Sequence, residues 1–284
     1  MNSAAFIDAQ GRGKHSWPRT LGTLGLMVAA AAAIIIPLRA VVLPWLSANA
    51  DDMPEPVRSG ILALSAGLIF GGALAGLFLG VRWLHARGAR TLLTAAPRFR
   101  WAQLALGFGL SAAMVGGASW LLDPASVKPL SSVDPRALAF GALALLVGFS
   151  IQSSAEEILF RGYILQVARR GLRSRWAAAL LSIALFTLVH VGYGIEAAIF
   201  SLTSAVGITI CVLLLDGLEF AIGAHIANNF IVALLFEELS NANAPSVSGI
   251  AWEELAANGV IMAVLVAVAL LLRRRPVSLS ATAA

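Results

Sequence analysis

The stretch Pro135–Ala168, PRALAFGALALLVGFSIQSSAEEILFRGYILQVA, determines which class of fold this chain can adopt. A membrane-spanning helix needs about 20 predominantly apolar residues, and this stretch is longer than that while it carries Glu156, Glu157 and Arg161. Ionisable residues at bilayer depth cost roughly 2.5–3.5 kcal/mol each on insertion scales, so a chain that keeps several of them needs a reason. The default reason is a functional site.

The rest of the chain is equally apolar. Hydrophobic residues make up 59% of the sequence and charged residues only 12%, with a mean hydropathy of +0.84, whereas an ordinary soluble domain has roughly 25% charged residues. The sequence therefore predicts an all-α, polytopic membrane protein with about eight transmembrane helices. The predicted spans are Leu21–Leu46, Gly60–Leu84, Ala102–Leu122, Pro135–Ala168, Trp176–Val191, Ile195–Leu215, Leu218–Phe236 and Ala256–Leu272.

The distribution of basic residues predicts the domain organisation and the orientation. We expect a single transmembrane domain over residues 21–272, with its polar motifs inside 150–236, between tails at 1–20 and 273–284. Arginine and lysine cluster before span one, between spans two and three, after span four and after span eight. Because short cytoplasmic loops carry the positive excess, both tails are predicted to be cytoplasmic. The abundance of Ala, Gly and Arg favours a bacterial cell membrane.

Charge, cysteine content and the N-terminus exclude several other classes. The net charge of +5 follows from this distribution of basic residues, so no nucleic-acid partner is expected, and the bilayer itself is the predicted surrounding. Cys211 is the only cysteine, which excludes an intrachain disulfide and a cysteine-based metal site. The first apolar run exceeds the roughly 7–15 residues of a signal peptide, so we expect an uncleaved first span.

The charged residues of span four form the first motif, Glu-Glu-x-x-x-Arg. Residues four apart share a helix face, so Glu157 and Arg161 are expected to form a charge-assisted pair. Glu156 lies about 100° round the helix from Glu157. It has no basic partner four residues on, because that position is Phe160. A buried carboxylate without a full counter-charge suits a general base. The alternative is that all three residues form an ion-pair network that only pins span four.

Two further motifs lie on spans five and seven. His190 follows Phe186 by one turn, and His225 shares a face with Asn229. A lone histidine within a span is more often satisfied by a neighbouring carbonyl than catalytic. His225 and Asn229 could likewise serve as hydrogen-bonded contacts between helices. These structural explanations must, however, hold for three spans at once.

Together the three motifs, Glu-Glu-x-x-x-Arg, Phe-x-x-x-His and His-x-x-x-Asn, resemble the CPBP family of intramembrane proteases, which includes CAAX-processing endopeptidases and bacterial Abi-type relatives. The resemblance covers Glu156 to Asn229 and implies hydrolysis of a peptide bond within the membrane. In that reading Glu156 activates the attacking water with help from His190. His225 and Asn229 stabilise the oxyanion, while Glu157 and Arg161 hold Glu156 in place.

Metal dependence stays open in the sequence. Two histidines and a glutamate form a familiar zinc set, so Glu156, His190 and His225 are the candidate ligands if zinc is bound. The chain has no His-Glu-x-x-His motif, and a glutamate that ligates metal cannot easily serve as the base. No cofactor is therefore favoured, with zinc as the alternative.

The depths of these residues present a difficulty. At about 1.5 Å per residue, Glu156 lies some 30 Å along span four from its predicted outer end. By the same count, His190 lies about 21 Å along span five from the inner end. The two would not meet if both helices were straight and began at the membrane surface. Span four is long enough to tilt or to project beyond the membrane. We nevertheless expect spans four, five and seven to line one polar cavity.

Other functions remain as alternatives. A proton-coupled transporter could use Glu156, His190 and His225 as a relay, but no pairing of broken spans between two halves is present. A catalytically inactive immunity or binding protein could retain the fold alone. For a protease, the predicted substrate is a membrane-associated protein or peptide precursor, and in a bacterium a prenylated substrate is less expected.

Overall fold

The computed structural model describes residues 6–236 and 251–273, and the statements below concern these residues. This part of the chain is helical and contains no strand, which confirms the all-α class. Two π-helical segments join consecutive helices: Leu38–Val42 links α1 to α2, and Ile158–Ile164 (η6) links α5 to α6. The helices are α1 Trp17–Pro37, α2 Leu43–Ala48, α3 Glu55–Trp83, α4 Trp101–Leu122, α5 Pro135–Glu157, α6 Leu165–Leu172, α7 Arg175–His190, α8 Ile195–Leu215, α9 Glu219–Leu235 and α10 Trp252–Leu272.

Every predicted span corresponds to a helix, and the predicted ends are close to the observed ones. Seven helical stretches are long and apolar enough to cross a membrane, and α9, with 17 residues, is a shorter apolar helix. At about 1.5 Å per residue, α9 is roughly 26 Å long. Its first residue, Glu219, is fully buried and ion-paired with Arg100, so α9 starts inside the bundle. The chain is a multi-pass membrane protein.

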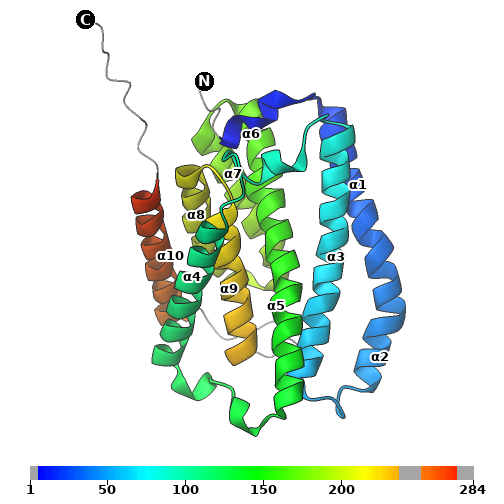
Figure 1. The fold of residues 1–284 in the computed structure, drawn as a ribbon, viewed down its shortest axis with the longest axis vertical. Coiled ribbons are helices and arrows are strands. Elements are labelled where there is room, and N and C mark those ends of the chain that lie inside the picture. The colour runs from blue at the N-terminus through cyan, green and yellow to red at the C-terminus, as the bar shows by residue number, and fades with distance from the viewer. Residues whose placement is uncertain (1–5, 237–250, 274–284) are drawn as a thin grey trace, which may run out of the picture.

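The helices form one bundle around the central pair α5 and α9 (Figure 1). Helix α3 packs on α1 and α5, α9 packs on α4 and α5, and α8 packs on α7 and α10. Asp134 caps α5, because its Oδ2 accepts a hydrogen bond from the amide of Ala137 at 2.9 Å. With η6 and α6 this helix continues to Leu172, which gives 38 residues in one helical stretch.

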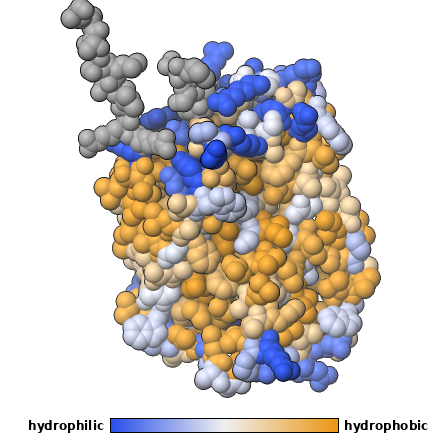
Figure 2. All heavy atoms as spheres, viewed as in Figure 1, coloured by the Kyte–Doolittle hydropathy of each residue, from blue (hydrophilic) through white to orange (hydrophobic). Residues whose placement is uncertain are grey.

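An apolar belt surrounds the bundle between two more polar ends (Figure 2). The tryptophans mark both borders of this belt, since they are exposed and lie at or near helix ends. Such aromatic belts are typical of the two membrane interfaces. One end of the bundle carries Trp17, Trp83, Trp101 and Trp176, and the other carries Trp45, Trp120 and Trp252.

The arginine-rich segments lie at one end of the bundle. Helix α1 begins there, α3 and α6 end there, α4 and α7 begin there, and α10 ends there (Figure 1). This agrees with the expected grouping of basic loops, and the cytoplasmic location of that end remains a prediction. Of the predicted tail 273–284, only Arg273 lies within the described residues. Within the predicted tail 1–20, Phe6–Arg12 forms a short 3-10 helix that packs on α6.

Helices α3 and α5 cross closely through glycines. A Cβ atom on Gly67 would lie 2.9 Å from the Cα of Gly148, and one on Gly148 would overlap the carbonyl oxygen of Ala63. Small residues at such crossings let helix backbones approach each other in membranes. This crossing positions the half of α5 that precedes the charged motif.

We expect Gly148→Ala to destabilise the folded protein by about 1–3 kcal/mol, because the added methyl group overpacks the crossing. Gly109→Ala on α4 is the matched control, since no atom lies within 4 Å of a Cβ built there. Thermal unfolding in detergent measures both variants. Equal stability of the two would contradict the close crossing.

Candidate active site

The charged motif of α5 forms a buried ion pair. Glu157 and Arg161 are each only 1% exposed, and the Nη1 of Arg161 donates to the Oε1 of Glu157 at 3.2 Å. The pair bridges the end of α5 and the π-helical segment η6. The structure therefore contains the contact expected from the four-residue spacing.

Arg161 also contacts two other helices. Its Nε donates to the Oγ1 of Thr209 on α8 at 3.5 Å, and its Cζ lies 4.0 Å from the ring centroid of Phe186 on α7. A guanidinium over an aromatic face at this distance is a favourable cation–π contact. Thr209 was not among the predicted site residues, and its only signal is a hydroxyl within an apolar span. Arg161 thus connects α7 and α8 to the motif on α5.

His225 on α9 faces both carboxylates of the motif. Its Nδ1 lies 2.8 Å from the Oε1 of Glu157, and its Nε2 lies 3.7 Å from the Oε2 of Glu156. With Nδ1 at Glu157, the other ring nitrogen, Nε2, is directed at Glu156. A gap of this length exceeds a direct hydrogen bond and can be bridged by a water molecule.

Glu156 itself is 8% exposed and accepts a hydrogen bond from the Nε2 of Gln152 at 3.2 Å. Gln152 lies four residues earlier on the same face, so the helical period could have identified it. No arginine or lysine within the described residues forms an ion pair with Glu156. Its surroundings thus differ from those of Glu157, as the sequence predicted.

Asn229 lies one turn beyond His225 on α9. Its Nδ2 donates to the Oγ of Ser153 on α5 at 3.3 Å, and its Oδ1 accepts from the Nδ2 of Asn228 at 3.1 Å. Ser153 is fully buried and was not predicted. Polar contacts at Ser153 and Glu157 therefore join α9 to α5 on both sides of Glu156.

His190 does not join this cluster directly. Its Nδ1 donates to the carbonyl oxygen of Phe186 at 2.8 Å, and within the described residues it forms no hydrogen bond or ion pair with Glu156. The ring of Phe186 lies 4.4 Å from that of His190 and 6.3 Å from that of His225, between centroids. Phe186 is one turn nearer the arginine-rich end than His190. It is therefore Phe186 that meets the motif, consistent with the difference in depth counted from the sequence.

A cavity of about 110 Å³ lies beside Glu156, and its lining differs from our expectation. We expected a polar cavity between spans four, five and seven, but this cavity is apolar apart from Glu156. The reason is that α1 and α3, rather than α7 and α9, cover this face of Glu156. The residues that line the cavity are Met27, Phe70, Ala73, Leu74, Leu77, Ala155, Glu156 and Leu159.

The candidate zinc ligands do not assemble into a metal centre in this arrangement. No group of three His, Cys, Asp or Glu side chains within the described residues has the spacing of a metal site. His225 is directed at two carboxylates, and His190 has one ring nitrogen bound to a backbone carbonyl. A zinc centre at Glu156, His190 and His225 would thus require these side chains to rearrange.

Comparison with known families confirms the resemblance predicted from the motifs. The family model of type II CAAX prenyl endopeptidase Rce1-like proteins matches residues 137–231, which include all three motifs. The chain is also 28% identical over 198 residues to the uncharacterized protein YyaK of Bacillus subtilis (strain 168), covering 66% of each chain. No solved structure matches. The match therefore supports a resemblance to CAAX-processing endopeptidases over the segment that carries the three motifs.

The buried ion pair generates a test of stability. We expect Arg161→Gln to destabilise the fold by about 3–5 kcal/mol, because Glu157 is left charged and without its guanidinium. The double variant Glu157→Gln with Arg161→Gln removes both charges and should recover part of this loss. Denaturation in detergent measures both. A single variant as stable as the wild type would show that the pair does not support the fold.

Proposed function

We propose that the protein is an intramembrane endopeptidase in which Glu156 activates a water molecule to hydrolyse a peptide bond of a membrane-associated protein or peptide. The observation that carries the proposal is the position of His225, between the carboxylates of Glu156 and Glu157 at 3.7 and 2.8 Å. A partly buried imidazole between two carboxylates on a neighbouring helix provides groups that can accept, hold and return a proton.

The reaction proceeds in two steps. Glu156 takes a proton from the water, and the oxygen forms a bond to the carbonyl carbon of the substrate. The carbon–nitrogen bond then breaks, and the proton passes to the leaving amine. General-base assistance of this kind contributes typically 10²–10⁴-fold to the rate.

The neighbouring residues have distinct roles in this proposal. Gln152, which donates to Glu156 at 3.2 Å, orients the carboxylate. Glu157 and Arg161 position His225 and the end of α5, whereas His225 and Asn229 stabilise the oxyanion of the tetrahedral intermediate. The Nε2 of His190 forms no hydrogen bond within the described residues, while Nδ1 holds the ring on the carbonyl oxygen of Phe186, so Nε2 is available to assist the water.

We expect Glu156→Gln to lower turnover by at least about 100-fold, because the amide keeps the size of the side chain but cannot accept the proton. The measurement compares peptides in membranes from cells that express the wild type or the variant, by mass spectrometry. Glu254→Gln, an exposed residue of α10, is the control and should leave the peptide pattern unchanged. A pattern from Glu156→Gln that matches the wild type, at equal folded yield, would exclude Glu156 as the base.

Metal analysis separates direct water activation from zinc catalysis. For direct activation by Glu156, we expect no stoichiometric metal in active, purified protein and no loss of activity with a strong chelator. Zinc held by Glu156, His190 and His225 would instead give about one equivalent of metal per chain. A strong chelator would then remove both metal and activity, and added zinc would restore both. That second outcome would overturn the metal-free mechanism while leaving the protease function intact.

A further inference from the structure

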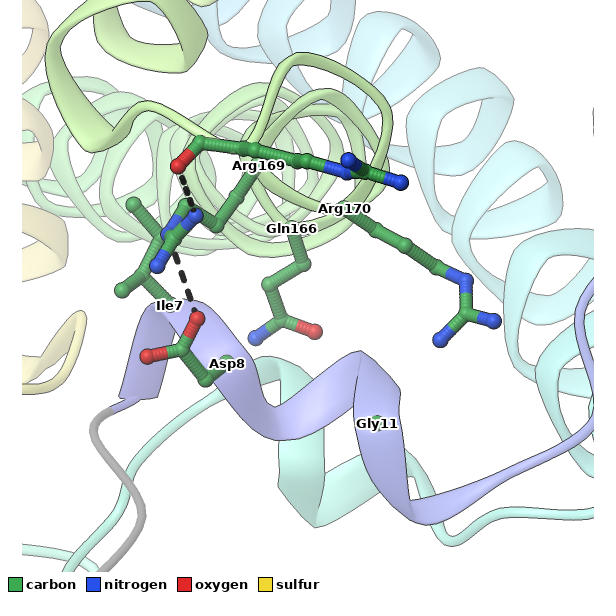
Figure 3. Close-up of a pocket in the computed structure, with 7 residues that line it drawn as sticks. Ile7, Asp8, Gly11, Gln166, Arg169 and Arg170 are labelled. Carbon is green, nitrogen blue, oxygen red and sulfur yellow. Dashed lines mark hydrogen bonds and ion pairs between the residues drawn. The ribbon is translucent and has the colours of Figure 1, made fainter.

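The arginine-rich end of the bundle contains a second cavity, remote in the fold from Glu156. It has a volume of about 240 Å³ and lies between α6 and the N-terminal helix Phe6–Arg12 (Figure 3). One water occupies roughly 30 Å³ in the liquid, so the cavity has room for a group several times larger. Its lining includes Arg169, Arg170 and Arg173 but only one carboxylate, that of Asp8.

The N-terminal helix is firmly attached over this cavity. Phe6 is 1% exposed, and its amide donates to the Oδ1 of Asp216 at 3.2 Å. The Nε2 of Gln166, which is fully buried, donates to the carbonyl oxygens of Phe6 and Thr91 at 3.1 and 2.9 Å. The cavity is therefore held between elements far apart in the sequence.

Two of the lining arginines have their charges available. Arg169 is paired with Asp8 at 3.2 Å. The guanidinium groups of Arg170 and Arg173 form no hydrogen bond or ion pair with the part of the chain that the structure describes, and both residues are exposed. In Figure 3 the side chain of Arg170 extends beside Gln166 toward the N-terminal helix. A planar guanidinium matches the oxygens of a phosphate group well.

A further arginine, Arg87, contacts Gln166 but is not itself among the residues that line the cavity. Arg87 is 4% exposed, and its Nη1 donates to the Oε1 of Gln166 at 2.7 Å. Its Nε and Nη2 are buried without a hydrogen-bond partner among the described residues. Burial lowers the pKa of Arg87 to about 10, so it remains charged at neutral pH. A buried cation without a carboxylate is costly, and an anion in the adjacent cavity would compensate it.

We infer that this cavity is a binding site for a phosphate group, with Arg170 and Arg173 as its direct contacts. The N-terminal helix and α6, which line the cavity, lie at one end of the bundle (Figure 1), where polar residues border the apolar belt (Figure 2), and phospholipid headgroups lie at such a border. Clusters of basic residues at this depth recognise anionic headgroups. The phosphate can therefore come from an anionic lipid or from a soluble compound.

The test uses the full-length protein with two probes, phosphatidylglycerol in nanodiscs and inorganic phosphate in detergent. Native mass spectrometry counts retained lipid, and a thermal shift measures phosphate binding. We expect Arg170→Gln with Arg173→Gln to weaken binding by about 10-fold or more, since each basic residue contributes about 1 kcal/mol near an anionic surface. Loss of lipid binding alone identifies a headgroup site, and loss of phosphate binding with unaltered lipid binding identifies a soluble ligand.

Arg82→Gln with Arg98→Gln is the matched control. Both arginines are exposed at the same end of the bundle, and the two substitutions remove the same amount of charge as the test pair. Gly11→Asp provides an independent test, since Gly11 lines the cavity and a Cβ there has open space. It should weaken binding while Gly11→Ala does not. Equal losses in the two arginine pairs, or no binding of either probe to the wild type, would overturn the proposal.

Discussion

The candidate site depends on the hydrogen bonds that the buried carboxylate of Glu157 accepts. Its Oε1 accepts from Arg161 at 3.2 Å and from His225 at 2.8 Å while the residue is 1% exposed. Through Arg161 this carboxylate reaches Thr209 on α8 and Phe186 on α7, and through His225 it reaches α9. One anion therefore sets the positions of four helices around Glu156. A charge so deeply buried must be compensated, and its compensation assembles the site.

The structural and functional explanations of these residues are compatible. The hydrogen bond from His190 to Phe186 is the carbonyl contact of an ordinary packed histidine, and Asn229 with Ser153 is an ordinary contact between helices. The pair of Glu157 and Arg161 could likewise serve only to pin α5. Glu156 is different, because Gln152 and the more distant His225 are its polar neighbours and no arginine or lysine of the described residues forms an ion pair with it. A purely structural network would not need this second carboxylate, because an ionisable side chain at this depth is costly to the bundle.

The helices and the charged pair could be predicted because they follow from local periodicity. Apolar length locates each span, and the four-residue spacing pairs Glu157 with Arg161. The π-helical segment Ile158–Ile164 could not be predicted, since no local periodicity indicates it; within this segment a Cβ on Gly162 would lie 2.7 Å from the carbonyl oxygen of Leu92. Such segments often occur at functional sites. The contacts of Thr209 and Ser153 likewise depend on helix rotation, which apolar periodicity does not determine when helices are apolar on every side.

The cavity beside Glu156 is lined partly by residues inside the segment that the family model matches and partly by residues outside it. Ala155, Glu156 and Leu159 lie within the matched residues 137–231, whereas Met27, Phe70, Ala73, Leu74 and Leu77 precede them on α1 and α3. The motifs that would carry the hydrolysis are thus all inside the matched segment, but most of the apolar wall beside Glu156 is outside it. In the proposed endopeptidase, an apolar pocket beside the base would discriminate between side chains by the volume it leaves free, so replacements on α1 and α3 would change the accepted side chain without altering the motifs. The substrate preference of the proposed endopeptidase would therefore depend on helices that the family match does not cover.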